Sequence, residues 1–305
     1  MESPAASFRA MSVNVTLLGS GVGQEEVSRA AALGAAMAER WETLFSRFRH
    51  ESLLCRLNRA DGAWFPADAE FMAVLEIARA GVGATGGRFD PAVLPALEAA
   101  GYDRDIDLVR TGAERHMATG RTAATRGADA WQAVEIDRAT GMVRLPQDMR
   151  IDLGGIAKGA FADQLAGRLA HWPGGLVDAG GDLRAWGLAP DGGPWRVAVE
   201  DPLRPTRDIA FVDLIAPERA GGVATSGTLR RRWSTGDGAA HHLIDPATGA
   251  PITGGRVAAT VFAPTCAAAE IATKAMLVGA AAGEVAPVDG VAFARLIGAD
   301  GTIEH

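Results

Sequence analysis

The chain of 305 residues has little cysteine and few aromatic side chains. Its two cysteines, Cys55 and Cys266, are too few for a disulfide framework or a zinc ribbon, so we interpret them as free thiols or one incidental pair. Aromatic residues make up 6% of the chain, and Tyr102 is the single tyrosine. The shortage of cysteine excludes a small disulfide-stabilised scaffold and leaves the fold to a hydrophobic core.

Long apolar runs are also missing. The sequence has no uncharged apolar stretch of about 18 residues, and its start lacks a basic segment followed by an apolar one. We therefore expect a soluble protein with no stable membrane insertion. The expected location is cytoplasmic for the sequence as it stands, and periplasmic only if a leader has been removed.

Positive charge is not in excess. The chain has 30 lysine and arginine residues against 37 aspartate and glutamate residues, so its formal net charge is -7. Negative charge opposes the counterion release that drives nucleic-acid binding, and we expect no nucleic-acid partner. A small anionic ligand stays compatible, because helix N-termini and glycine-rich turns bind phosphate locally.

What the chain does contain is typical of a globular protein: 48% hydrophobic residues, 22% charged residues and 38 glycines. The order of patterns, with helices first, strands later and no strict alternation, predicts an α+β fold of mixed β-sheets flanked by helices. Apolar periodicity predicts helices over 24–48, 68–81, 156–169 and 266–281. Alternation and turn residues predict strands over 8–18, 175–179, 195–200, 208–215 and 257–263, hairpins over 134–145 and 291–303, and a surface loop near 115–130.

One glycine-rich segment is a misleading signal. Residues 19–23 (GSGVG) follow a predicted strand and precede a helix, as a dinucleotide-binding loop does. The glycine spacing differs from that of a dinucleotide-binding loop (G-x-G-x-x-G). No strand–helix–strand unit follows with an acidic residue about 20 positions further on, so we reject that interpretation.

The segment 151–159 (IDLGGIAKG) carries the strongest local signal. Asp152 ends a strand-like run, two glycines follow, and Lys158 lies in the first turn of a predicted helix. Unpaired N–H groups, the helix dipole and an ammonium group all favour bound phosphate there. A plain strand-to-helix turn with a solvated lysine fits equally well. Thr225, Ser226 and Gly227 likewise form either a turn or cap, or hydroxyl donors to phosphate.

Two further segments offer candidate side chains. If His241 and His242 lie on a strand, they point to opposite faces, so only one can face a pocket. Glu270, Thr273 and Lys274 share one face of a predicted helix. A carboxylate with a hydroxyl suits Mg²⁺, whereas Glu270 and Lys274 alone form a routine ion pair.

In this order, the motifs resemble those of the ApbE family, the FAD:protein FMN transferases. The resemblance runs from Met11 to about Gly279. It rests on Met11, on 45–48 (FSRF) with Ser52, Leu57 and Asn58, on 87–91 (GRFDP), on Gly101 and Tyr102, on 151–159 with Asp163, on 180–182 (GGD), on 225–227 (TSG) and on 242–249 (HLIDPATG).

The resemblance implies metal-assisted cleavage of the FAD pyrophosphate, transfer of FMN to a Thr or Ser hydroxyl of an acceptor flavoprotein, and release of AMP. It implies a single T-fold-like domain over 1–305, with the nucleotide pocket between parts of about 1–150 and 151–305. His242 and Lys158 would be catalytic, as a base and a phosphate cation. The expected FAD contacts are Met11, Asn58, Tyr102, Asp152, Gly155, Lys158, Asp163, Thr225, Ser226, His242 and Lys274; the expected Mg²⁺ ligands are the Ala157 carbonyl, Glu270 and Thr273.

The last helix departs from the family pattern, which places Asp and Thr four residues apart as metal ligands. One register gives Ala269 and Thr273 at these positions, and the other gives Glu270 and Lys274. We favour the second, because it keeps a carboxylate. Either Glu270 and Thr273 hold the metal, or Lys274 replaces it as a fixed cation. The second outcome leads to an alternative function, an FAD-binding protein with little or no transfer activity; an FAD pyrophosphatase is the third hypothesis.

Overall fold

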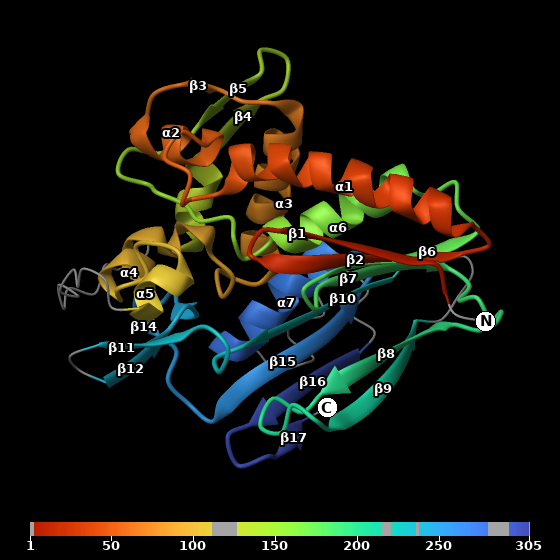
Figure 1. Cartoon of the computed structure of the whole chain (residues 1–305). Coiled ribbons are helices and arrows are strands. Elements are labelled where there is room, and N and C mark those ends of the chain that lie inside the picture. Colours follow the sequence, from red (N-terminus) through yellow and green to blue (C-terminus); the bar gives the residue numbers. More distant parts are fainter. Residues whose placement is uncertain (1–2, 112–126, 215–220, 236–237, 280–292, 305) are drawn as a thin grey trace.

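A single large antiparallel sheet organises the chain. The computed structural model describes residues 3–111, 127–214, 221–235, 238–279 and 293–304 (Figure 1). Its eight-stranded sheet has the order β1-β2-β6-β7-β10-β15-β16-β17. The strands are β1 (Ala5–Ala10), β2 (Val13–Ser20), β6 (Gly174–Ala179), β7 (Leu183–Gly187), β10 (Gly221–Gly227), β15 (Arg256–Ala263), β16 (Phe293–Gly298) and β17 (Ile303–Glu304).

The predicted α+β class is confirmed, with one difference. Every neighbouring pair in the large sheet is antiparallel, so the sheet is not a mixed one. Short connections such as the β1–β2 and β6–β7 turns join antiparallel strands directly, whereas parallel pairs need long crossovers.

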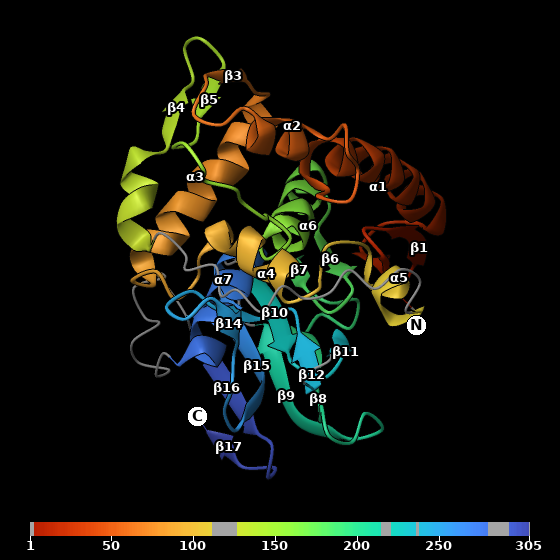
Figure 2. The same ribbon diagram turned by 90° about the vertical axis from the view of Figure 1, so that its left-hand side faces the viewer.

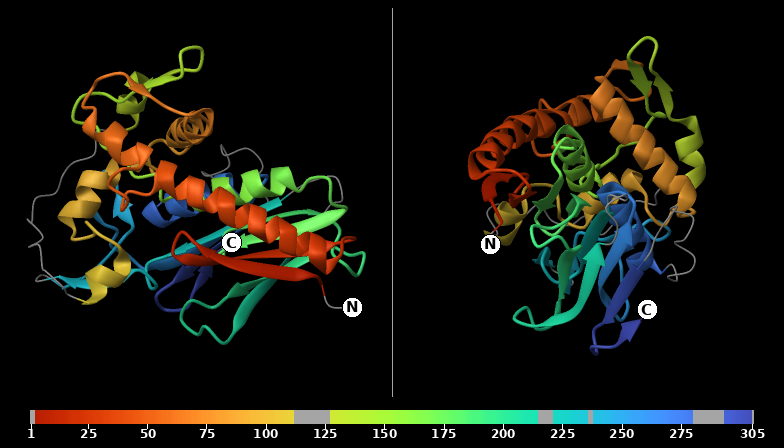
Figure 3. Two further views of the ribbon diagram at one scale, coloured as in Figure 1. Left: turned by 45° about the horizontal axis from the view of Figure 1, so that its top comes forward. Right: turned by 90° about the vertical axis from the view of Figure 1, so that its right-hand side faces the viewer.

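The longer helices lie on one side of this sheet. They are α1 (Gln24–Phe45), α3 (Ala69–Ala84), α6 (Ala157–Arg168) and α7 (Cys266–Val278). Helices α1, α6 and α7 contact the strands of the sheet, and α3 packs against α7. Figures 2 and 3 show α6 beneath α1 and α3, with the sheet on its other side. The main core lies between these layers and includes Trp41, Phe71, Phe161 and Val177, all at most 3% exposed.

Smaller elements complete the described chain. The short helices are α2 (Leu53–Arg59), the 3-10 helix η1 (Pro91–Val93), α4 (Leu94–Ala99), α5 (Ile106–Thr111) and the 3-10 helix η2 (Ala128–Ala133). A small sheet joins β3 (Phe65–Pro66), β5 (Met142–Arg144) and β4 (Glu135–Asp137). Two-stranded pairs join β8 (Trp195–Glu200) with β9 (Asp208–Leu214), β11 (Arg232–Thr235) with β12 (Gly238–His241), and β13 (Ile244–Asp245) with β14 (Ala250–Pro251).

Most predicted elements are confirmed within a few residues, and one strand is corrected. The predicted strand over 8–18 is in fact parts of β1 and β2, joined by a turn at Met11 and Ser12. Both turn residues have positive φ, 49° and 61°, a conformation that tight hairpin turns require. Apolar alternation continues across so short a turn, and this hides the turn from a pattern search. Most of the loop predicted near 115–130, at 115–126, lies outside the described residues.

Two other expectations concern a dinucleotide-binding loop and membrane-spanning helices. Residues 19–23 lead from β2 into α1, and the neighbour of β2 is the antiparallel β6, which agrees with the rejection of a dinucleotide-binding loop. In the described part of the chain, no helix is both long and apolar enough to cross a membrane.

Candidate active site

A cavity of about 1240 Å³ lies beside the first turn of α6, one side of α7 and strand β10. Its size exceeds that of ordinary drug-sized pockets, so a dinucleotide-sized ligand fits the space. Eleven of the residues predicted from the sequence line it: Met11, Tyr102, Asp152, Gly155, Ala157, Lys158, Thr225, Ser226, His242, Glu270 and Lys274. The tertiary structure therefore brings together most of a set that is scattered along the sequence.

Asn58, Asp163 and Thr273 do not line the cavity. The Asn58 amide donates to the Ile151 carbonyl and accepts from the Ile151 N–H, both at 2.9 Å, and so fixes the segment before Asp152, which is not a strand. Thr273 is fully buried beneath Ser226. The expected contacts of Asn58 and Asp163 with FAD remain predictions.

Helices α6 and α7 cap each other. The Asp163 carboxylate of α6 accepts the N–H groups of Cys266 and Ala267, at 2.9 and 3.0 Å, in the first turn of α7. In return, the Glu270 carboxylate of α7 accepts the N–H of Gly159 at 2.7 Å, in the first turn of α6. Carboxylates are favourable at helix N-termini, where N–H groups lack partners.

Gly159 permits this close approach. A Cβ atom at that position would lie 2.8 Å from the backbone carbon and oxygen of Cys266 and from the Ala267 nitrogen. Such distances are too short for any real Cβ contact, so only glycine fits without a shift of one helix.

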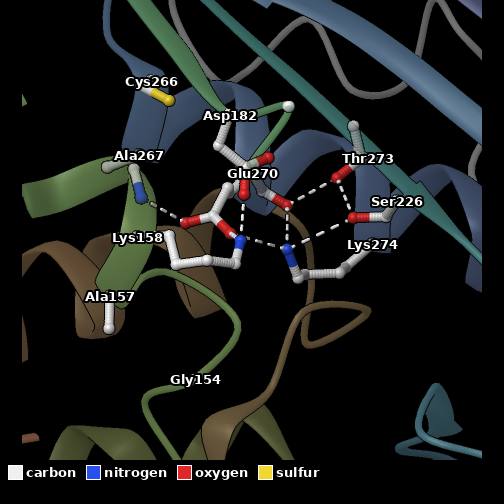
Figure 4. Close-up of polar contacts among 12 residues, drawn as sticks. Gly154, Ala157, Lys158, Asp182, Ser226, Cys266, Ala267, Glu270, Thr273 and Lys274 are labelled. Carbon is white, nitrogen blue, oxygen red and sulfur yellow. Dashed lines mark hydrogen bonds and ion pairs between the residues drawn. The ribbon is translucent and has the colours of Figure 1, made fainter. Parts of the chain in front are cut away.

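Two partly buried lysines and two buried carboxylates form a cluster at the cavity wall (Figure 4). Lys158 Nζ donates to Asp182 Oδ2 and, at 2.8 Å, to Glu270 Oε1. Lys274 Nζ lies 3.5 Å from the same Glu270 oxygen. Asp182 is 3% exposed and Glu270 is 1% exposed. Two ammonium groups therefore offset two carboxylates, and the cluster has no net formal charge.

Burial and pairing shift the pKa values of the cluster in opposite directions. Burial raises the pKa of Asp182 to about 6, although Lys158 opposes this. Burial alone would raise the pKa of Glu270, but the two lysines outweigh it and lower that pKa. Burial alone would lower the pKa of Lys158, and Asp182 and Glu270 together raise it. Lys158 is thus held firmly in its charged form.

Lys274 is held more loosely than Lys158. Its Nζ reaches Ser226 Oγ at 3.3 Å and the Glu270 carbonyl at 3.2 Å, both long for charge-assisted bonds. Ser226 Oγ in turn shares a hydrogen bond with Thr273 Oγ1 at 2.8 Å. Thr225, the next residue of β10, pairs with Thr260 at 2.9 Å. Residues 225–227 therefore lie on a strand, and neither a turn nor a helix cap forms there.

The predicted magnesium ligands do not fit a metal site. The Ala157 carbonyl accepts the Trp41 indole N–H at 2.9 Å. Both Glu270 oxygens already accept hydrogen bonds, and Thr273 Oγ1 donates to the Glu270 carbonyl. Among the described residues, no three His, Cys, Asp or Glu side chains are placed to hold a metal ion.

Electrostatics also disfavours a divalent ion here. Since Mg²⁺ binds oxygen at about 2.1 Å, an ion on Glu270 Oε1 would lie within roughly 5 Å of the Lys158 ammonium, given its 2.8 Å bond to that oxygen. At an effective dielectric constant of about 20, that repulsion is about 7 kcal/mol. The neutral cluster supplies no excess negative charge to compensate for it.

His242 is the histidine that lines the cavity, whereas His241 bonds to the Ile252 carbonyl at 3.1 Å. Strand β12 ends at His241, so the alternation along a strand that the prediction assumed does not extend to His242. Burial lowers the pKa of His242 well below its usual range, and Arg231, Lys274 and His241 act in the same direction. Its Nδ1 is enclosed and has no hydrogen-bond partner in the described part of the chain. A neutral ring with an unsatisfied nitrogen is suited to accept a proton or a ligand hydrogen bond.

Sequence reasoning missed the role of Arg47. Its guanidinium lies 4.2 Å from the ring centroids of both Phe48 and Tyr102, and it donates to the Tyr102 carbonyl at 2.7 Å. Its Nη2 is enclosed without a partner among the described residues, and its Nε lies 3.5 Å from Asp152. A buried donor without a partner points to a ligand group in the cavity.

Lysine usage is a second signal that the motif search overlooked. Of the 30 basic residues, two are lysines, Lys158 and Lys274, and the rest are arginines. Both lysines meet at Glu270. A count by residue type would have singled them out.

The fold and the cavity together define an α+β protein with one large pocket that two lysines line, and comparison with known proteins gives the family. The model of the ApbE family matches residues 10–288. The chain belongs to the ApbE family.

Two relatives show how far the likeness extends. The chain is 29% identical over 254 residues to the FAD:protein FMN transferase of Klebsiella pneumoniae. This alignment covers 82% of this chain and 71% of that protein. The chain is 31% identical over 240 residues to the FAD:protein FMN transferase of Salmonella typhimurium, with 76% and 65% covered. The matched segment therefore spans about two thirds of these relatives.

Solved structures show the same architecture. The ApbE protein of Thermotoga maritima superposes with a TM-score of 0.83 at 26% identity, covering 100% of this chain and 97% of that one. The apo form of the Pseudomonas stutzeri flavinyl transferase ApbE gives a TM-score of 0.79 at 24% identity, covering 99% and 93%. The latter likeness concerns the fold alone.

Proposed function

We propose that this chain is an FAD:protein FMN transferase. It cleaves the pyrophosphate of FAD, attaches FMN to a Thr or Ser hydroxyl of an acceptor protein and releases AMP. The observation that carries the proposal is the cavity of about 1240 Å³, which Lys158, Lys274 and His242 all line. The relatives named FAD:protein FMN transferase support it.

The chemistry follows from the positions of these groups. The acceptor hydroxyl oxygen attacks the phosphorus on the FMN side of the pyrophosphate, and the bond from that phosphorus to the bridging oxygen breaks. The hydroxyl proton passes to the neutral His242 ring, and AMP departs with the bridging oxygen. Ammonium groups at the wall stabilise the negative charge that develops on the phosphate oxygens.

The apolar and aromatic part of the cavity suits the ring system of a flavin. Arg47 and the Tyr102 ring form one wall at 4.2 Å from each other, and Met11 lines the same cavity from the β1–β2 turn. Planar ligands stack on such walls, and a fixed guanidinium donates to ring carbonyls.

No step of this reaction is assigned to magnesium. The sequence predicts Mg²⁺ dependence through Ala157, Glu270 and Thr273, and this remains a prediction that the contacts of the three residues disfavour.

The test is AMP release from FAD by the purified protein, with a candidate acceptor domain present. AMP together with an FMN mass gain on the acceptor is the expected result. AMP with free FMN would indicate a pyrophosphatase. Saturable FAD binding without AMP would indicate a flavin-binding protein, and would overturn the proposal once several acceptors have been tried.

A matched pair of variants separates catalysis from binding. His242→Ala removes the proposed base, and we expect the rate of AMP release to fall by about 100-fold or more while FAD affinity changes little. His241→Ala is the control, because His241 does not line the cavity. Equal losses in both variants would argue against His242 as the base.

A further inference from the structure

The two lysines of the chain have different surroundings. Lys158 is bound by the Asp182 and Glu270 carboxylates, which hold it in place. Among the described residues, the contacts of Lys274 Nζ are all longer, at 3.2 to 3.5 Å, and Lys274 lines the cavity. Since an ammonium has three donors, Lys274 can exchange long contacts for a phosphate oxygen at little cost.

The Lys274 side chain packs against the glycine turn before α6. A Cβ atom at Gly155 would lie 3.2 Å from Lys274 Cε and 3.5 Å from its Cδ. The aliphatic stem therefore packs against a position where any larger residue would press on it. The turn and α7 together bring the ammonium beside Ser226, close enough to His242 for the lysine to lower the pKa of that ring.

Positions 158 and 274 both carry lysine, whose ammonium group is a compact point charge. Elsewhere the chain uses arginine for its basic side chains, including surface ion pairs such as Arg150 with Glu98. An ammonium is small and concentrates its charge, as a metal ion does, whereas a guanidinium is planar and spreads its charge.

We propose that Lys274 takes the place of a divalent metal ion in this chain, so that the cluster binds the FAD pyrophosphate without Mg²⁺. Lys158 and the carboxylates Glu270 and Asp182 position the ammonium, and Lys274 contacts the phosphate. The proposal rests on the proposed function for the identity of the ligand. It accounts for three observations together: the occupied oxygens of Glu270, the neutral cluster, and a loosely held ammonium at the cavity wall.

The first experiment uses the fact that only two lysines are present. Protein labelled with ¹⁵N at lysine Nζ gives two side-chain signals, assigned with Lys274→Met. In EDTA, FAD is expected to shift the Lys274 signal strongly and the Lys158 signal weakly. MgCl₂ alone, up to millimolar concentration, is expected to shift neither. Saturable shifts of these signals with MgCl₂, before any FAD is added, would overturn the proposal.

The second experiment measures FAD affinity by quenching of flavin fluorescence. In EDTA, Lys274→Met is expected to weaken FAD binding about 10- to 100-fold, the range for a lost bond to a charged group. Arg150→Gln is the matched control: it removes one positive charge from an exposed surface pair and is expected to change affinity less than about 2-fold. Mg²⁺ is expected to leave the affinity of the parent protein unchanged. Unaltered affinity in Lys274→Met would refute the proposal.

The two proposals fail in different ways. If FAD shifts the Lys274 signal in EDTA but no AMP appears with any acceptor, the lysine site stands and the transferase proposal falls. If AMP appears only with Mg²⁺, the transferase proposal stands and the lysine proposal falls. Equal rates of AMP release in EDTA and in Mg²⁺ support both.

Discussion

The reciprocal capping of α6 and α7 leads to a quantitative prediction for Asp163. Its carboxylate accepts two N–H groups at the start of α7 and lies 3.5 Å from Arg184. It does not line the cavity. Asp163→Ala is therefore expected to reduce stability rather than FAD binding.

The size of the loss follows from the contacts. Hydrogen bonds to a charged group contribute about 1.5–3 kcal/mol each. Burial raises the pKa of Asp163, so the cost of burying the charge offsets part of this gain. We expect the free energy of unfolding to fall by about 2–4 kcal/mol, or about 1 M in the urea midpoint for a chain of this size.

The assay is urea unfolding followed by tryptophan fluorescence, with FAD affinity measured on the folded protein. Asp191→Ala is the control, because Asp191 accepts one N–H at 2.9 Å in an exposed loop and its loss should cost less than about 0.5–1 kcal/mol. If Asp163→Ala weakened FAD binding while its urea midpoint matched the control, Asp163 would be a ligand contact and the capping argument would be wrong.

Three further predictions concern the same region. Gly159→Ala should lower the midpoint of thermal unfolding, because the added Cβ clashes with α7. Gly167→Ala is the control: it lies in the same helix with nothing within 4 Å, and it should leave the midpoint unchanged or raise it. Equal midpoints in the two variants would contradict the close approach of α6 and α7 at Gly159. Burial lowers the pKa of His242, so kcat/KM for AMP release should stay constant as the pH falls through 6.5 and should decrease only at lower pH. A decrease in kcat/KM with its midpoint at pH 6.5 or above would refute this. Arg47→Lys should weaken FAD binding about 5- to 30-fold, because it removes the guanidinium that forms a wall of the cavity with Tyr102; an unchanged Kd would show that this wall does not contribute to FAD binding.

The predictable part of the fold is the part that depends on local pattern. Periodicity placed α3, α6, the β4–β5 hairpin and β15 within a few residues, because each buries one face or strip of its own segment. The β1–β2 hairpin and β10 were misassigned. In the β1–β2 hairpin, apolar alternation continues through the tight turn, so the pattern does not distinguish the turn from one continuous strand. In β10, the glycine-rich composition does not distinguish a strand from a loop.

The candidate site divides in the same way. The sequence by itself determined the residue types: a carboxylate, two glycines and a lysine before α6, a hydroxyl pair, two histidines, and the Glu270–Lys274 helix face. It could not decide which partner each group takes. Only the tertiary structure brought Glu270 within hydrogen-bond reach of Lys158 and Gly159, 111 or more positions away in the chain. Long-range packing, with α6 and α7 meeting at a glycine, fixes those pairings, and no local pattern encodes the distance between two helices.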